Sequence, residues 1–269
     1  TLGSSGLNAM AGSGAAGQGV IIPSVTAASF RKVPAQPKPT PLAKAPVREL
    51  LEKVKGLNGP LPRIGKDGEQ LPWEIYARPL TGNEKGRRVG LLVTGLGLSR
   101  AATMAAINKL PGEVSLVFEP YAPDLNGWLL RARLAGHEVF VGLPMESESF
   151  PAKDPGPLAL STTVQVADNM KRLYSILSSF SGYVGVVSTM GSKFSEAEGQ
   201  LKPILAELKK RGLMFVDGGA NARSVAPRMA NEIDLPRAKN NLTLDDPPSP
   251  DNISKKLRQL EKLIRNNTT

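Results

Sequence analysis

Three carboxylates in this chain could do hydrolytic or metal chemistry, namely Glu146, Asp217 and Asp245. Together they could hold a hard cation such as Mg²⁺ or Ca²⁺, or serve as an acid and a base in hydrolysis. Single acids that follow strands are more often helix caps or solvated groups, so both interpretations stay open from the residues alone.

A glycine turn suggests a second chemistry, the binding of a phosphate. The turn Gly95-Leu96-Gly97 precedes a predicted helix, whose first amide groups could bind an anion. However, Arg100 stands where a dinucleotide fingerprint has its third glycine, and no acid follows about 20 residues later to bind a ribose. A plain strand-to-helix turn is therefore the favoured interpretation.

Two serines, Ser188 and Ser192, could act as nucleophiles, but the base that they need is missing. No Gly-x-Ser-x-Gly elbow surrounds either serine. The single histidine, His137, stands at the start of a predicted strand, so we expect it at the opposite end of the sheet. We predict that His137 is a structural hydrogen-bonding residue beside Glu138.

The composition excludes several classes of protein. The 269 residues include no cysteine and one histidine, which excludes disulfides and any zinc site built from several Cys or His ligands of one chain. The formal net charge of +10 favours acidic surroundings such as anionic polymer or lipid headgroups. Only 5% of the residues are aromatic and no nucleic-acid recognition module is present, which argues against nucleic-acid binding.

Short apolar runs alternate with helix-length amphipathic segments from Arg87 onward. Strands are predicted at Val89–Val93, Val114–Phe118, Glu138–Leu143, Tyr183–Val187 and Leu213–Asp217, with a weaker one at Leu242–Leu244. Helices are predicted at Arg100–Lys109 with Ser99 as N-cap, Leu125–Ala135, Val164–Phe180, Glu196–Arg211 and Asn252–Ile264. The alternation indicates a parallel sheet in a barrel-like or doubly wound α/β domain, with chemistry at the carboxyl ends of the strands.

Two segments precede this α/β pattern. Residues 1–48 are rich in Gly and Ser and then in Pro, and they contain no acid before Glu49. We interpret them as a basic leader or linker, whose positive charge could contact an anionic polymer or lipid. Residues 49–85 are predicted to form a short helix at Glu49–Lys55 and a connector that Trp73 and Tyr76 anchor to the main domain, residues 86–269.

Seven short motifs occur in the order that is found in one bacterial family. They are Gly90–Leu98 (GLLVTGLGL), Leu116–Pro123 (LVFEPYAP), Gly136–Val139 (GHEV), Leu143–Glu146 (LPME), Gly185–Phe194 (GVVSTMGSKF), Arg211–Asp217 (RGLMFVD) and Leu244–Asp246 (LDD). Over residues 86–264 the chain resembles the divergent polysaccharide deacetylases. The resemblance implies a deformed (β/α) barrel like that of carbohydrate esterases, which remove acetyl groups from glycans with a metal-bound water.

The chain departs from this family where the metal would bind. Family members that keep the metal have a paired aspartate after the first strand, and Thr94 and Gly95 replace it here. The histidines expected before Leu-Pro-Met and before Met-Gly-Ser are replaced by Gly142 and Thr189. Catalytic zinc needs about three protein ligands. No cofactor is therefore predicted, although the family implies a divalent metal such as zinc.

These departures predict a degenerate deacetylase-like domain, which binds a cell-envelope glycan of the peptidoglycan type without deacetylating it. The residues predicted to bind the glycan in a cleft at the strand ends are Thr94, Tyr121, Met145, Glu146, Ser188, Thr189 and Met190, joined by the catalytic candidates Asp217 and Asp245. Two alternatives stay open. One is an active hydrolase that uses Asp217 and Asp245 with a hard metal, and the other is a scaffold protein without enzymatic activity.

The resemblance carries two further expectations. It implies a periplasmic or exported location, because the glycans concerned belong to the cell envelope. It also implies a last strand and a glycine-containing loop beyond the final helix. The sequence stops at Thr269 without them, so we expect a barrel that is incomplete at its C-terminal end.

Overall fold

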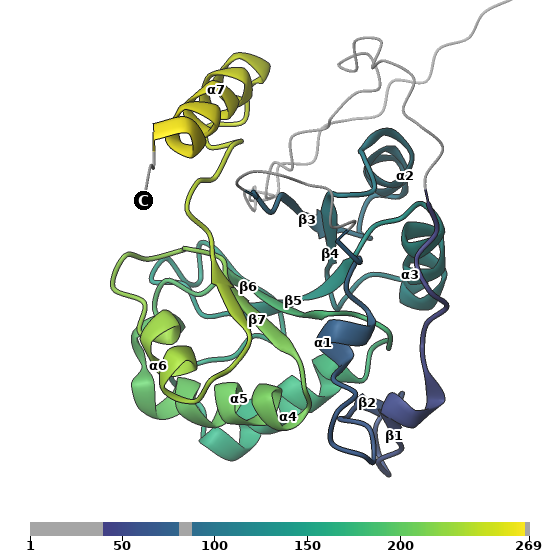
Figure 1. Ribbon diagram of the computed structural model, residues 1–269. Helices are drawn as coiled ribbons and strands as arrows, with labels where there is room; N and C mark the ends of the chain where they lie inside the picture. Colours follow the sequence, from purple (N-terminus) through teal and green to yellow (C-terminus); the bar gives the residue numbers. More distant parts are fainter. Residues whose placement is uncertain (1–39, 81–87, 267–269) are drawn as a thin grey trace, which may run out of the picture. The chain divides into compact units, whose positions relative to one another are not determined.

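A parallel sheet of six strands forms the centre of the fold in the computed structural model, which describes residues 40–80 and 88–266 (Figure 1). Its strands are β3 (Leu92–Leu96), β4 (Ser115–Phe118), β5 (Val139–Met145), β6 (Gly185–Met190), β7 (Met214–Asp217) and β8 (Arg237–Lys239). Neighbours in the sheet follow the order of the chain. This is the order of a barrel sheet, since a doubly wound sheet reverses direction.

The α/β class is confirmed, and the strands β3 and β8 form the two edges of the sheet within the described residues. Six helices follow the strands: α2 (Arg100–Lys109), α3 (Leu125–Leu134), α4 (Val166–Leu177), α5 (Glu198–Lys210), α6 (Ala226–Glu232) and α7 (Pro250–Asn266). A short 3-10 helix, η3 (Phe194–Glu196), precedes α5. No helix in the described part of the chain is long and apolar enough to cross a membrane.

The predicted N-cap and most predicted elements are confirmed. The Ser99 hydroxyl accepts a hydrogen bond of 3.3 Å from the amide of Ala102, so α2 begins at Arg100 as expected. The weak strand predicted at Leu242–Leu244 is wrong, because the chain pairs earlier, at β8. All three residues of β8 are exposed and two are basic, so this edge strand carries no apolar pattern that a sequence could reveal.

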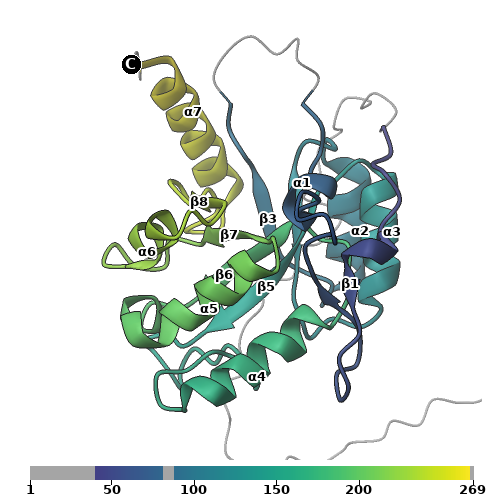
Figure 2. The ribbon, with the colours of Figure 1, turned by 60° about the horizontal axis from the view of Figure 1, so that its bottom comes forward.

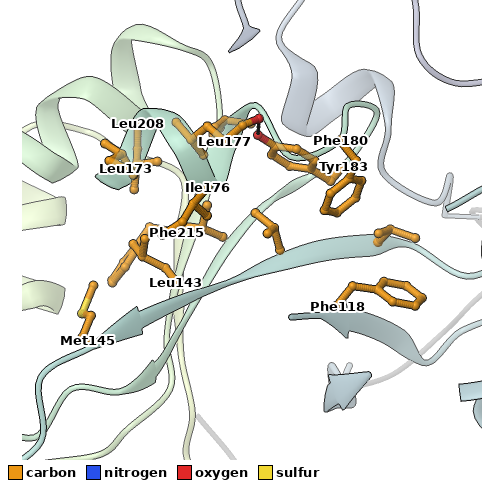
Figure 3. Close-up of a cluster of buried hydrophobic side chains, with 14 of the residues drawn as sticks. Phe118, Leu143, Met145, Leu173, Ile176, Leu177, Phe180, Tyr183, Leu208 and Phe215 are labelled. Carbon is orange, nitrogen blue, oxygen red and sulfur yellow. Dashed lines mark hydrogen bonds between the residues drawn. The ribbon is translucent and has the colours of Figure 1, made fainter. Parts of the chain in front are cut away.

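One face of the sheet is covered by helices and forms the larger core. In β5, Val141, Leu143 and Met145 pack on this helix-covered face against residues such as Leu173 and Ile176 of α4. Figure 3 shows this cluster, in which the Tyr183 hydroxyl donates a 2.8 Å hydrogen bond to the carbonyl of Leu177. We call this cluster the helix-side core and the opposite side of the sheet the inner face.

The half of the inner face that is nearer the amino ends of the strands is covered by the chain that precedes the sheet. Here Val117, Phe140 and Val216 form a second buried cluster with Leu50 and Tyr76. This covering segment comprises η2 (Arg48–Leu50), β1 (Leu51–Glu52), its antiparallel partner β2 (Leu61–Pro62) and α1 (Pro72–Ile75). Residues 40–80 therefore contribute to the body that contains the sheet (Figure 2).

The helix predicted at Glu49–Lys55 is wrong. The chain forms one 3-10 turn that inserts Leu50 into the inner cluster, and it then extends to pair Leu51 with Pro62. Burying Leu50 completely outweighs the local helix propensity of the segment. The anchoring role predicted for Tyr76 is confirmed, because its side chain is 1% exposed and its hydroxyl accepts a hydrogen bond from the amide of Val47.

A buried arginine on α3 holds the covering segment in place. The Arg133 guanidinium donates to the carbonyl of Ala43 through Nε and Nη2, and to the carbonyl of Tyr76 through Nη1, at 2.8 to 3.1 Å. It also lies 5.6 Å from the centre of the Tyr76 ring. A buried guanidinium needs such hydrogen-bond acceptors, because its transfer from water to the protein interior costs free energy.

His137 has the structural role that the sequence predicts. It is fully buried, and its ring nitrogens lie 2.8 Å from the carbonyl oxygen of Val114 and 3.1 Å from that of Ile107. The ring therefore joins the last turn of α2 to the start of β4, on the amino side of the sheet and away from the strand ends.

Replacing Arg133 tests whether the covering segment depends on it. We expect Arg133→Ala to lower the free energy of unfolding in urea by about 3 kcal/mol, because it leaves buried carbonyl groups without donors. Arg131→Ala on the same helix is the matched control, since Arg131 forms an exposed ion pair with Asp124 and should cost less than about 1 kcal/mol. Equal losses in the two variants would contradict this role.

Candidate functional site

Four adjacent strands bring polar positions together at their carboxyl ends on the inner face. In β5, Gly142 stands between Val141 and Leu143, which belong to the helix-side core, so position 142 lies on the inner face. A Cβ atom at Gly142 would lie 3.1 Å from Oε2 of Glu119, the residue that follows β4. Glu119 therefore shares this face with Gly142.

Thr94 and Thr189 lie on the same side by the same alternation. Val93 packs against the helix-side core, which places Thr94 on the inner face of β3. Val187 belongs to the inner cluster, which places Thr189 on the inner face of β6, where it pairs in register with Pro144. We call Thr94, Glu119, Gly142 and Thr189 the strand-end face.

Glu119 is the acidic group of the strand-end face. Burial raises the pKa of its carboxyl group, and a hydrogen bond from the amide of Gly95 opposes this only in part. Within residues 40–80 and 88–266, no Lys or Arg forms an ion pair with Glu119. No ion pair within the described residues therefore offsets the effect of burial on this carboxyl group.

Glu146 has a different environment, since its carboxylate is fully engaged. Oε2 accepts hydrogen bonds from the Ser161 hydroxyl and from the amide and hydroxyl of Thr162, and Oε1 lies 2.6 Å from Nζ of Lys193. Burial favours the neutral form, but these partners outweigh it and lower the pKa of Glu146 to about 2. The group ties together the loops that follow β5 and β6.

Tyr121 also ties a loop to the strand ends. Its hydroxyl donates to the carbonyl of Pro155 at 3.0 Å and accepts from the amide of Leu158 at 3.1 Å. Gly156 lies so close to the ring that a Cβ atom there would be 2.7 Å from the hydroxyl oxygen. The half-buried ring thus positions the loop after β5 beside the strand-end face.

Three predicted site residues lie on the helix-covered side. Met145 is buried in the helix-side core. Asp217 follows Val216 of the inner cluster, so alternation places its side chain on the other side, where it is 3% exposed. Ser188 lies on that side too, and its hydroxyl accepts a 2.9 Å hydrogen bond from the amide of Gly218.

The Asp217 carboxylate contributes to a turn after β7. Its Oδ1 atom accepts a 3.0 Å hydrogen bond from the amide of Gly219, while Oδ2 is buried without a hydrogen-bond partner in the described part of the chain. Asp245 is exposed and lies in a turn between β8 and α7, and Met190 is 45% exposed at the end of β6.

The residues present do not fit the metal site that the family implies. Of the four positions in the strand-end face, three hold threonine or glycine and only Glu119 offers a charged ligand. Across the residues that the structure describes, no group of three or more His, Cys, Asp or Glu could hold a metal ion. The set of Glu146, Asp217 and Asp245 therefore does not form such a site.

Glu119 is the residue that the sequence argument did not select. The sequence shows it in the motif Glu119-Pro120-Tyr121 at the end of a strand, where a carboxylate is as informative as Glu146 after the next strand. The residues around each strand end decide how each acid is engaged, with Ser161, Thr162 and Lys193 on Glu146 and the amide of Gly95 on Glu119.

A consecutive parallel sheet with its polar positions at the carboxyl ends defines a barrel-type α/β protein. Residues 91–269 match the sequence model of a family described as divergent polysaccharide deacetylase. Because the match covers more than half of the chain, this protein belongs to the divergent polysaccharide deacetylase family, and the resemblance of its motifs is confirmed.

Its relatives include proteins without an assigned function. A solved structure of an uncharacterised protein from Agrobacterium tumefaciens superposes with a TM-score of 0.75 at 36% identity, over 78% of this chain and 84% of that chain. An uncharacterised protein of Haemophilus influenzae is 26% identical over 143 residues, covering 53% of this chain and 50% of the relative. The uncharacterised protein YibQ of Escherichia coli is 24% identical over 159 residues, covering 59% and 49% respectively.

This chain spans about half the length of these two curated relatives. They and the solved structure show similarity in sequence and fold, and their names specify no substrate, cofactor or partner.

The ion pairing of Glu146 predicts a pH-dependent contribution to stability. Its pKa is lowered in the folded protein, so its contribution is complete above the unfolded value near 4.5 and disappears as the pH falls toward 2. We expect Glu146→Gln to lower the free energy of unfolding by about 3 kcal/mol at pH 7 and by much less at pH 3, measured in urea.

The matched control is Glu148→Gln, two residues along the same loop. Glu148 is exposed and pairs with Arg223, so its replacement should cost less than about 1 kcal/mol. A deficit in Glu146→Gln that stayed constant from pH 7 to pH 3 would show that the carboxylate charge is not the cause.

Proposed function

We propose that this domain binds a cell-envelope glycan of the peptidoglycan or chitin type through its strand-end face and does not deacetylate it. One observation supports this proposal above all. Polar side chains lie at the strand ends, with Thr94 on β3, Glu119 after β4 and Thr189 on β6, but the described residues offer no group that could hold a metal. These side chains can still form hydrogen bonds with a sugar, whereas the described residues provide no set of ligands for a catalytic ion.

The chemistry of these side chains suits sugar recognition. Threonine hydroxyls donate and accept hydrogen bonds, as sugar hydroxyls require, and a carboxyl group adds a strong acceptor. Hydrolysis of an acetyl group by the mechanism of the family needs a metal-bound water with a pKa near 7. Threonine and glycine do not supply the ligands for that step.

The alternative of a hydrolase based on Asp217 and Asp245 has less support. Asp217 is buried on the helix-covered side of β7, and Asp245 is exposed in a turn beyond β8. Catalysis by two carboxylates requires both to reach one substrate. This alternative would be favoured if the wild-type protein hydrolysed a glycan substrate and if folded Asp217→Asn and Asp245→Asn each lost that hydrolysis.

An exported or periplasmic location belongs to the proposal, because a cell-envelope glycan lies there. The proposal includes a contact of the basic leader, residues 1–48, with anionic polymer or lipid, and residues 1–39 of it lie outside the described part of the chain. Such a contact should weaken steeply between low and physiological salt. A scaffold role without glycan binding would show the salt-sensitive contact alone.

Glycan binding and acetate release test the proposal directly. We expect the protein to bind chitin oligosaccharides or peptidoglycan fragments equally well with and without a chelator. We expect no acetate release from either glycan when zinc, cobalt or manganese is added. Robust metal-dependent release of acetate would refute the proposal. A protein that binds neither chitin oligosaccharides nor peptidoglycan fragments would also refute it.

Removing single hydroxyls locates the binding surface. We expect Thr94→Val and Thr189→Val each to weaken binding roughly threefold to tenfold, which corresponds to one lost hydrogen bond. The control is Ser175→Ala on α4, because its hydroxyl bonds the carbonyl of Lys171 on the helix-covered side. Titration calorimetry measures the affinity of each variant. Affinities of Thr94→Val and Thr189→Val equal to that of the wild-type protein would place the glycan elsewhere.

A further inference from the structure

The last helix, α7, is amphipathic, and its apolar residues recur at a spacing that aligns them in one stripe. The residues of this α7 stripe are Ile253, Leu257, Leu260 and Ile264. Within the described residues, Ile253, Leu257 and Leu260 belong to neither the helix-side core nor the inner cluster. Leu257 is 38% exposed and Leu263, which lies beside the stripe, is 46% exposed. Apolar surface of α7 is therefore open to solvent.

Basic side chains lie on the opposite side of α7. Because successive residues of a helix are about 100° apart, Lys255, Arg258 and Lys262 point away from the α7 stripe. We call these three residues the basic side. All three are exposed, and none forms an ion pair within residues 40–80 and 88–266. Residues 250–264 contain four Lys or Arg and two Asp or Glu, so the helix is positively charged.

Polar contacts attach the first turns of α7 to the segment that follows β8. Nζ of Lys256 donates hydrogen bonds to the carbonyl of Thr243, at 2.7 Å, and to the carbonyl of Asp246. Nδ2 of Asn252 donates a 2.8 Å hydrogen bond to the carbonyl of Pro247. The α7 stripe takes no part in these contacts, so they hold the helix without burying its apolar side.

The charge of α7 decides which kind of partner fits it. A second copy of the helix would bring two positively charged helices together, and like charges repel each other. A soluble anionic polymer would attract the basic side but would offer no apolar phase to the α7 stripe. An anionic lipid bilayer offers both, because its headgroups attract Lys and Arg and its acyl chains accept apolar side chains.

We propose that α7 is an interfacial helix that docks on an anionic lipid bilayer, with the α7 stripe at the boundary of the acyl chains and the basic side toward the headgroups and water. The helix is about 25 Å long and carries charges, so it lies along the bilayer and does not cross it. Its diameter of about 10 Å is close to the Debye length at 0.1 M salt, so the basic side still senses the anionic surface. This inference does not depend on glycan binding.

Sedimentation of the full chain with lipid vesicles measures the docking. We expect the protein to bind vesicles of equal parts phosphatidylglycerol and phosphatidylcholine about tenfold more tightly than vesicles of phosphatidylcholine alone. The basic leader also contributes to this attraction, so variants of α7 are needed to assign it.

Replacing two residues of the α7 stripe removes its apolar contribution. We expect the double variant Leu257→Gln and Leu260→Gln to bind the anionic vesicles about tenfold more weakly, because less apolar surface leaves water on docking. The matched control is the double variant Leu130→Gln and Leu134→Gln, since these two leucines are equally exposed on α3. The control should bind as the wild-type protein does. Circular dichroism verifies the fold of each variant.

Replacing the basic side separates α7 from the overall positive charge. The test variant combines Lys255→Gln, Arg258→Gln and Lys262→Gln, and we expect it to bind the anionic vesicles about tenfold more weakly at low salt. The control removes the same charge from exposed positions of the covering segment with Lys53→Gln, Lys55→Gln and Lys66→Gln. Equal losses in these two variants would overturn the role of α7.

A fluorescent label reports which side of α7 meets the lipid. The chain contains no cysteine, so one introduced cysteine carries an environment-sensitive fluorophore at a single position. We expect the emission of a label at Leu257→Cys to shift to the blue on anionic vesicles and that of a label at Lys262→Cys to stay as in water. Labels that both stay as in water would overturn the proposed docking.

The remaining outcomes also decide the proposal. It is overturned if the full chain does not bind anionic vesicles, or if the folded variant with Leu257→Gln and Leu260→Gln binds them as tightly as the wild type. A label at Leu257→Cys that is blue-shifted without vesicles also overturns it. A second copy then covers the stripe if the shift depends on protein concentration, and the same chain covers it if not. We expect glycan binding to be unchanged in every α7 variant, so a failure here leaves the proposed function standing.

Discussion

The apolar half of the inner face has to be buried, because its side chains would otherwise be exposed to water. The position of the candidate site depends on which segment buries it. Val117, Phe140 and Val216 are covered by Leu50 and Tyr76 from the segment before the sheet. That segment is held by a buried guanidinium on α3, because Arg133 supplies donors to carbonyls that would otherwise be buried without partners. The cover stabilises the sheet and defines where the inner face stops being core.

The site begins where this cover ends. Beyond the apolar half, the inner face continues through Gly142, Thr189, Thr94 and Glu119, which lie at the carboxyl ends of four adjacent strands. The loops that follow these strands are fixed by their own polar contacts, with Tyr121 holding the loop after β5 and Glu146 joining it to Lys193. Most polar groups near the strand ends thus have structural partners, and Glu119 differs in that no Lys or Arg of residues 40–80 and 88–266 forms an ion pair with it.

The replacement of metal ligands changes what this edge can do. Thr94, Gly142 and Thr189 leave the fold of the family intact, since none of them serves the helix-side core. They offer no ligands for a metal of the kind that the family implies, and the Glu119 carboxyl group packs directly against Gly142. A surface that keeps hydroxyl and carboxyl groups but loses the ion is suited to holding a sugar, which is why binding is proposed in place of deacetylation.

The sequence by itself determined the α/β class, the positions of most strands and helices, the Ser99 cap, the structural role of His137 and the family, because apolar periodicity, capping residues and ordered motifs are local features. Tertiary structure decided that Leu50 enters the inner cluster in place of a helix, and that an exposed Arg-Ala-Lys segment is the edge strand β8. It also divided the candidate residues between two faces, with Thr94 and Thr189 on the same face as Glu119 and with Met145 and Asp217 on the helix side. Spacing along the chain cannot make these choices, since each depends on which distant segment buries a side chain or neutralises a charge.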